Sequence, residues 1–181
     1  YFMGDYAFYG CTRLKNAIFK GNVASIGAEA FRLCTNLYDV KFEKELGALG
    51  EQAFGGCGFE QIKLPEGIKL MPSKLFSGCQ KLKKVNIPST VTRIEDHVIN
   101  YTAIQYINIP SSVAVIDDYA FAGVMDLFIF CEAEEKALGW CSKWNYNGNS
   151  ISDVPLITYW NEQYSAPTFE FTIMENGSSH I

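Results

Sequence analysis

The chain has 181 residues, of which 48% are hydrophobic and 19% are charged, and its formal net charge is −5. This composition excludes an intrinsically disordered chain, which combines low hydrophobicity with high charge. The acidic excess also excludes a general nucleic-acid-binding domain, which is basic. No run of about 18 apolar residues occurs, so the sequence predicts no insertion into a membrane.

An anchor residue recurs along the first two thirds of the chain at intervals of 22 or 23 residues. The anchors are Phe8, Phe31, Phe54, Phe76, Ile99 and Phe121. A fixed interval of about 20 to 50 residues is the signature of a repeat architecture, in which each repeat is one supersecondary unit. The stretch from Met3 to Phe8 matches Ile26 to Phe31 position for position, so we expect the sequence to begin in mid-repeat and to be a fragment of a longer protein.

After each of the first five anchors, apolar residues follow at positions that we number 0, +3 and +5. We expect the residue between positions +3 and +5 to be exposed, and this alternation predicts one short parallel strand per repeat with one face buried. In chain order these triplets are Leu14, Ala17, Phe19; Leu37, Val40, Phe42; Phe59, Ile62, Leu64; Leu82, Val85, Ile87; Ile104, Ile107, Ile109. Pro65, Pro88 and Pro110 directly follow three of these strands and should end them, because proline cannot donate to a strand ladder.

A second apolar pair follows each strand and should face the same core from the opposite wall. The pairs are Val23 with Ile26, Leu46 with Leu49, Ile68 with Met71, Val91 with Ile94, and Val113 with Ile116. Gly27 and Gly50 then mark a turn, after which we expect a short turn of α- or 3₁₀-helix to bring the next anchor into the core. No repeat can bury both faces alone, so stacking of repeats must supply the core.

Four cysteines occupy one repeat position, three residues after the anchor: Cys11, Cys34, Cys57 and Cys79. Equivalent positions stack along a solenoid, and free cysteine behaves as a small buried hydrophobe, so we predict a ladder of unpaired core thiols. A structural zinc site would need a compact pair of cysteines, which the sequence lacks. Cys131 and Cys141 are left as a candidate disulfide.

The phrase "IPSTVTRIEDHVI", together with "AFGGC" and "LFSGC" at repeat junctions, resembles the BspA-like class of leucine-rich repeats, found largely on bacterial and some protist surface proteins. The resemblance covers residues 1 to about 131 and implies an α/β, right-handed solenoid that is mostly strand and irregular structure. It further implies a secreted or cell-surface location and a role in adhesion or partner binding. Other leucine-rich repeats carry an asparagine at one fixed position of every repeat. This ladder is missing here, since only Asn22 lies at the corresponding position, +8.

The repeat ends near Cys131, so we divide the chain into a solenoid over residues 1–131 and a C-terminal cap over residues 132–181. Residues 132–140 read as a short helix, and residues 154–160 and 168–173 as strands. A cap would cover the apolar end of the last coil. Because Trp140, Trp144 and Trp160 all lie here, an aromatic platform for sugar rings is the alternative.

The sequence contains no constellation that supports catalysis. His97 and His180 are the only histidines and lie far apart, and His97 sits in a polar stretch that should be a solvated turn. There is no phosphate-binding glycine loop, nucleophile elbow or zincin helix. We therefore predict a protein that is not an enzyme and that has no cofactor or metal site.

The strand residues that point away from the core should form a continuous concave face, because repeat solenoids present such surfaces. At positions +1, +2 and +4 they are Lys15, Asn16, Ile18; Tyr38, Asp39, Lys41; Glu60, Gln61, Lys63; Lys83, Lys84, Asn86; Gln105, Tyr106, Asn108. Five lysines stand here against two carboxylates. Lysines that merely keep a sheet solvated are one interpretation, and a macromolecular partner, a protein or a glycan, is the other. A structural spacer within a longer surface protein is a third possibility.

Overall fold

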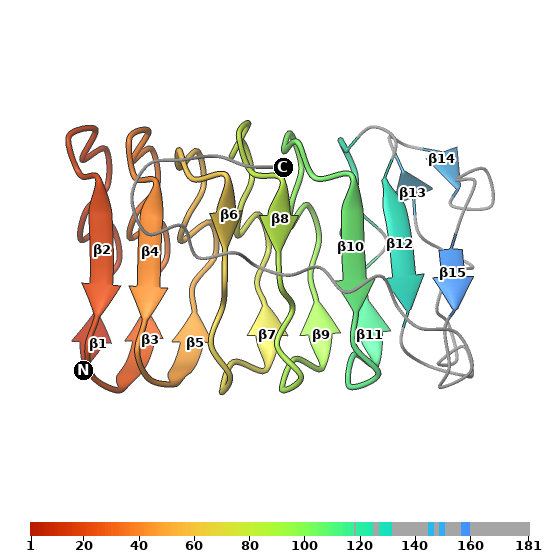
Figure 1. Ribbon diagram of the computed structural model, residues 1–181, viewed down its shortest axis with the longest axis horizontal. Coiled ribbons are helices and arrows are strands. Elements are labelled where there is room, and N and C mark those ends of the chain that lie inside the picture. Colours follow the sequence, from red (N-terminus) through yellow and green to blue (C-terminus); the bar gives the residue numbers. More distant parts are fainter. Residues whose placement is uncertain (118, 125–126, 132–144, 147–148, 151–156, 160–181) are drawn as a thin grey trace, which may run out of the picture.

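The computed structural model describes residues 1–117, 119–124, 127–131, 145–146, 149–150 and 157–159, and in this part of the chain it contains strands and turns but no helix. The chain winds as a solenoid between two walls of parallel strands (Figure 1). Strands of one wall run in the opposite direction to strands of the other, because the chain crosses from wall to wall within every coil. The predicted leucine-rich-repeat type of solenoid is confirmed.

The first wall holds the strands that the sequence predicts. Its strands are β2 (Asn16–Phe19), β4 (Asp39–Phe42), β6 (Gln61–Ile62), β8 (Lys84–Val85), β10 (Tyr106–Ile109), β12 (Phe128–Cys131) and β15 (Ile157–Tyr159). The pairings of β2 with β4, β6 with β8 and β10 with β12 are parallel and join residues at the same repeat position, such as Ala17 with Val40 and Ile62 with Val85. The register is therefore set by the repeat, since equal coils bring equivalent buried residues opposite one another.

The second wall consists of strands where the sequence predicted only an apolar return path. They are β1 (Phe2–Met3), β3 (Val23–Ile26), β5 (Leu46–Leu49), β7 (Leu70–Met71), β9 (Arg93–Ile94) and β11 (Val115–Ile116). Parallel pairing again joins equivalent residues, as in Ile26 with Leu49. Each coil therefore has two strands rather than one. The second strand of each coil was not predicted, because its buried residues lie three positions apart, as Val23 and Ile26 do, and do not alternate with exposed residues.

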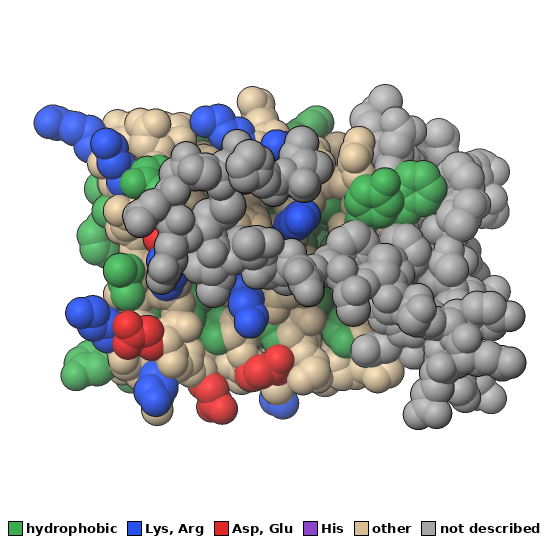
Figure 2. All heavy atoms as spheres, viewed as in Figure 1, with side chains coloured by type: hydrophobic (Ala, Val, Ile, Leu, Met, Phe, Trp, Pro, Cys, Tyr) green, Lys and Arg blue, Asp and Glu red, His purple; other side chains and the backbone are tan. Residues whose placement is uncertain are grey.

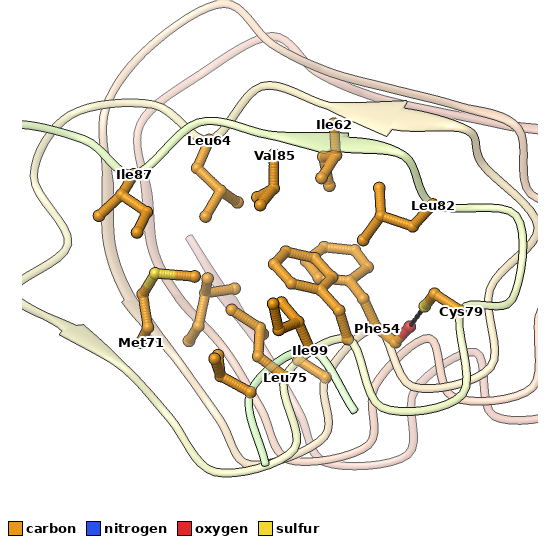
Figure 3. Close-up of a cluster of buried hydrophobic side chains, with 14 of the residues drawn as sticks. Phe54, Ile62, Leu64, Met71, Leu75, Cys79, Leu82, Val85, Ile87 and Ile99 are labelled. Carbon is orange, nitrogen blue, oxygen red and sulfur yellow. Dashed lines mark hydrogen bonds between the residues drawn. The ribbon is translucent and has the colours of Figure 1, made fainter. Parts of the chain in front are cut away.

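A single hydrophobic core runs between the walls, and the anchors form a column in it. The rings of Phe8 and Phe31 stack with centroids 5.2 Å apart, those of Phe31 and Phe54 at 5.4 Å, and those of Phe54 and Phe76 at 6.1 Å. Figure 3 shows Ile62 and Val85 of the first wall pointing toward Phe54, with Met71 and Ile99 approaching from the other side. The predicted stacking of equivalent side chains into one interior is confirmed.

The corner that carries each anchor is a tight turn and not the helical turn that we expected. The residues two before the anchors Phe8 to Ile99 have φ between 53° and 56°, and the residues two after all six anchors have φ between 54° and 77°. The second set comprises Gly10, Leu33, Gly56, Gly78, Tyr101 and Gly123. Left-handed backbone at both sites reverses the chain twice within a few residues, which a helix cannot do.

The predicted thiol ladder is confirmed for three of its four members. Cys34, Cys57 and Cys79 are unpaired and buried, and each Sγ donates a hydrogen bond, of 3.0 to 3.1 Å, to the anchor carbonyl of the preceding coil. Burial raises the pKa of all three thiols, that of Cys79 to about 12. Cys11 was expected in the core but is exposed, because no described coil packs on its outer side.

Several predictions for residues 132–181 lie outside the described residues: the helix over 132–140, the strand over 168–173, the three tryptophans and the partner cysteine of Cys131. Within the predicted strand 154–160, β15 pairs in parallel with β12. A short antiparallel pair that the sequence did not predict joins β13 (Asn145–Tyr146) to β14 (Asn149–Ser150). The cap as a unit stays a prediction.

Candidate binding face

The residues predicted to form the binding face lie on the outer surface of the first wall. Strand alternation turns positions +3 and +5 inward and positions +2 and +4 outward. Position +1 lies directly before each strand and is exposed. Twelve of the fifteen predicted residues are exposed, and Asp39, Asn86 and Asn108 are half-buried. The wall is a stack of parallel strands, so these side chains line up in columns that run along the solenoid axis.

The strand register shows which side chains are neighbours. Asn16 pairs with Asp39 and Ile18 with Lys41 across β2 and β4, while Gln61 pairs with Lys84 across β6 and β8. Position +2 thus forms one column and position +4 another. A ligand that lies along the axis would meet one side chain from each coil in turn, which is how repeat proteins build extended recognition surfaces.

Two of the five lysines on this face are neutralised by carboxylates of the same face. Lys41 Nζ lies 3.4 Å from Asp39 Oδ2, and Lys83 Nζ lies 3.1 Å from Glu60 Oε2. Lys15, Lys63 and Lys84 have no ion pair within 4.0 Å in the part of the chain that the structure describes. Figure 2 shows lysine and arginine side chains at several places on the face in view, with most of the visible carboxylates toward its lower border. The face is locally cationic on a chain that is acidic as a whole.

Exposed apolar side chains accompany the lysines. Ile18, Tyr38 and Tyr106 are about half exposed. The ring of Tyr106 stacks on that of Phe128 in the next coil, with centroids 5.5 Å apart. Phe128 was not among the residues predicted for this face, because the predicted strand pattern ends at Ile109, although Phe128 lies one repeat after Tyr106. Tyrosine presents an apolar ring with a polar tip, which suits it to interfaces.

Asn86 was predicted to face a partner, yet its side chain holds two coils together. Its Oδ1 accepts from Leu64 N at 2.6 Å, and its Nδ2 donates to Leu64 O at 3.0 Å. The amide thus replaces the backbone ladder where β6 and β8 end, next to Pro65 and Pro88. Its carbonyl oxygen and one N–H of its amide are both engaged by Leu64, so Asn86 contributes rigidity to this surface.

The remaining polar clusters lie at the corners and serve the fold. His97 Nδ1 is 3.0 Å from Asp96 Oδ2, and the His97 ring stacks on Tyr119. This hydrogen bond from His97 is the main cause that lowers the pKa of the Asp96 carboxyl. Among the described residues, no group of three or more His, Cys, Asp or Glu side chains could hold a metal ion, and no helix could cross a membrane. His180 lies outside those residues.

Comparison with known proteins agrees with this geometry. Residues 2–127 match the BspA type leucine rich repeat region in six copies. A leucine rich cell surface protein from Faecalibacterium prausnitzii A2-165 has a similar structure, with a TM-score of 0.67 and 32% sequence identity over 74% of this chain and 37% of that one. A leucine-rich repeat protein from Bacteroides ovatus ATCC 8483 has 19% identity and a TM-score of 0.32, over 75% of this chain and 53% of that one.

No curated protein matches the sequence. The chain spans about a third to a half of the length of these two structures. The number of matched copies equals the number of anchors, and the stacked coils account for the nearly constant spacing of the anchors. The chain therefore belongs to the BspA-type leucine-rich-repeat family.

Proposed function

We propose that this chain is a non-catalytic binding module of a secreted or cell-surface protein, and that the outer surface of its first wall holds a protein partner through an acidic patch. The observation that carries the proposal is the charge of that surface. Five lysines stand on it against two carboxylates, although the whole chain has a net charge of −5. Such a local reversal favours a partner of opposite sign.

The shape and stiffness of the surface support the same function. The strands are held in register from coil to coil, and Asn86 ties two coils together where the ladder ends. A rigid surface loses little conformational entropy when it binds, so more of the contact energy is available for affinity. Ile18, Tyr38 and the stacked pair of Tyr106 and Phe128 offer apolar anchors among the lysines.

The test is a matched pair of charge-reversal variants. In the face variant, Lys41, Lys63 and Lys84 become glutamate. In the control variant, Lys44, Lys69 and Lys81, which are exposed but are not among the outward residues of the first wall, become glutamate, so that both variants have the same net charge. Each chain, with its fold checked by circular dichroism, is used to capture proteins from cell-surface extracts.

We expect the wild type and the control to retain the same acidic protein and the face variant to lose it. We also expect the captured complex to weaken steeply with added salt, because screening reduces steering between exposed charges. If the face variant captured the same protein as well as the wild type does, the first wall would not be the binding surface.

Two other functions stay open as predictions. Carbohydrate binding would involve Trp140, Trp144 or Trp160, which lie outside the described residues. A glycan array that shows binding by the wild type and loss in Trp144→Ala or Trp160→Ala, with folding intact, would favour it. A spacer within a longer surface protein would bind nothing in either assay.

A further inference from the structure

We infer that the first wall binds its partner through an extended peptide segment of about seven residues, with acidic side chains at the third and fifth positions and an apolar side chain at each end. This inference rests on the proposed function and specifies the chemistry of the partner. It follows from the order in which lysines and apolar residues cross the wall. We call these residues the diagonal row: Ile18, Lys41, Lys63, Lys84, Tyr106 and Phe128.

The diagonal row contributes one outward side chain from each of six successive coils. Its first three members lie at position +4 and its last three at position +2. Ile18 pairs with Lys41 across β2 and β4, and Tyr106 pairs with Phe128 across β10 and β12. Figure 1 shows β2, β4, β6, β8, β10 and β12 in this order along the solenoid. A ligand that lies along the axis would therefore meet the members of the row one after another.

Two lysines in the middle of the row are available to a ligand. Lys63 and Lys84 are exposed and form no ion pair in the described part of the chain, whereas Lys41 lies 3.4 Å from the carboxylate of Asp39. Lys63 and Lys84 come from neighbouring coils and differ by two positions along the strand, which places their Cα atoms about 8 Å apart. Alternate side chains of an extended peptide project to the same side about 7 Å apart. Carboxylates at two alternate positions would therefore each meet one of these lysines.

Apolar residues flank the lysines at both ends of the row. Ile18 is 53% exposed, and Tyr106 is 47% exposed and stacks on Phe128. Ile18 and Tyr106 are four coils apart, which is about 20 Å at the usual strand spacing. An extended peptide covers the same distance in about six residue steps. A seven-residue segment would therefore place one apolar side chain on each end of the row while its third and fifth residues lie within reach of the lysines.

The peptide would be held by side chains and not as an added strand. An added strand pairs its backbone with a sheet edge, whereas the diagonal row crosses a sheet face whose strands already pair from coil to coil, as β2 does with β4 and β6 with β8. An anionic glycan carries carboxylates or sulfates but no apolar end groups, so it would leave Ile18 and Tyr106 unused. The arrangement of the row therefore favours a peptide.

The experiment measures the binding of three synthetic peptides to the full chain by isothermal titration calorimetry. The peptide LSESESF has acidic residues at its third and fifth positions and an apolar residue at each end. The peptide LESSSEF has the same composition and charge, but its acidic residues stand at the second and sixth positions. The peptide SSESESS keeps the acidic spacing and lacks the apolar ends. The termini of all three are acetylated and amidated, so that no terminal charge contributes.

Three double variants of the chain show which residues the peptides contact. The lysine variant combines Lys63→Gln with Lys84→Gln, and the apolar variant combines Ile18→Ser with Tyr106→Ser. The control variant combines Lys69→Gln with Lys81→Gln, two lysines that are exposed and lie outside the row, so that it has the same net charge as the lysine variant. Circular dichroism checks that every variant folds.

We expect LSESESF to bind the wild type and the other two peptides to bind at least ~5-fold more weakly. The lysine variant should bind LSESESF on the order of 10-fold more weakly, because it loses two exposed charge contacts that are each worth a few-fold in affinity. The control variant should lose less than ~2-fold. The apolar variant should bind LSESESF on the order of 5-fold more weakly and bind SSESESS as the wild type does, which a general loss of structure would not produce.

Equal affinities of LSESESF and LESSSEF would overturn the inference, because the spacing of the acidic residues would then not matter. Absence of binding by LSESESF up to ~1 mM would also overturn it. A sulfated polysaccharide that bound more tightly than LSESESF, with equal affinity for the wild type and the apolar variant, would assign the row to an anionic glycan and overturn it as well. The capture experiment with charge-reversal variants separately decides whether the first wall binds an acidic protein surface, so failure of the peptide and failure of the proposed function are distinguishable.

Discussion

The residue two positions after each anchor has left-handed backbone. We therefore predict that glycine is more stabilising than alanine at this position, whereas in a regular helix or strand alanine is the more stabilising of the two. Four of the six coils have glycine there, whereas Tyr101 holds φ at 54° and Leu33 holds it at 61°. A left-handed conformation costs a residue with a Cβ roughly 1–2 kcal/mol. Glycine avoids this cost but loses about 0.5–1 kcal/mol through the freedom of its unfolded chain. The balance favours glycine by about 0.5–1 kcal/mol.

The cleanest comparison is between Tyr101→Gly and Tyr101→Ala, because both variants lose the same largely exposed ring. We expect the glycine variant to be more stable than the alanine variant by about 0.5–1 kcal/mol, or about 1–4 °C in the midpoint of thermal unfolding. Urea unfolding monitored by circular dichroism gives the free energies. The control is Ala103, which is exposed and whose φ is not positive, so that Ala103→Gly should be destabilising by a similar amount. An alanine variant at Tyr101 as stable as the glycine variant would refute the reasoning about the corner.

Three further predictions follow from the core, the thiol ladder and the corner ion pair. Phe54→Ala should lower the free energy of unfolding by about 3–5 kcal/mol because the ring is fully buried. Phe8→Ala should lower it by clearly less, because that ring is partly exposed. Equal losses for the two variants in urea unfolding would contradict the described burial of the anchor rings. The raised pKa of the Cys79 thiol keeps it neutral in the folded chain, so its contribution to stability is complete below the unfolded pKa of about 8.5 and is lost as pH rises toward about 12. Cys79→Ala should therefore reduce the slope of stability against pH in this range by about 1.4 kcal/mol per pH unit, and an unchanged slope would show that the thiol is not buried as described. The lowered pKa of Asp96 acts in the opposite sense, because its contribution to stability is present above the unfolded pKa near 3.9 and is lost as the pH falls below that value. Asp96→Asn should therefore make the free energy of unfolding depend less steeply on pH in the acid range. Identical pH dependence in the variant and the wild type would argue against the contact between Asp96 and His97.

Much of the solenoid could be predicted from the sequence because its strongest signal is periodic. The anchors recur at a nearly constant interval, and equal coils must bring equal residues together, so the phenylalanine column and the buried thiols followed from spacing alone. The first-wall strands could be predicted equally well, since in four of the five predicted strands a polar residue separates the apolar positions +3 and +5. These features depend on which residues are apolar and how far apart they lie, which a sequence states directly.

Other features depend on backbone geometry that side-chain patterns do not reveal. The second wall buries residues three apart, such as Leu46 and Leu49, and this spacing fits an irregular return path as well as a strand. The corner was expected to be helical, and only the glycines at 10, 56, 78 and 123 hinted at left-handed backbone, because Leu33 and Tyr101 adopt it without glycine.

The sequence was sufficient to predict which residues make up the binding face, but not which contacts their side chains form. The sequence identified which side chains point outward, yet it could not show that Asn86 clamps Leu64 or that Asp39 and Glu60 each pair with a lysine. Such contacts depend on side-chain reach between neighbouring coils. Phe128 was missed because the sequence pattern was followed only as far as the fifth strand.

The central claim is that coils of nearly equal length lay equivalent side chains over one another and so build a shared interior beneath a lysine-bearing wall. A crystal structure of the full chain tests this most directly. We predict that the rings of Phe8, Phe31, Phe54 and Phe76 stand in one column with successive centroids 5.2, 5.4 and 6.1 Å apart. Rings that point to solvent or lie at unrelated positions in successive coils would contradict the account.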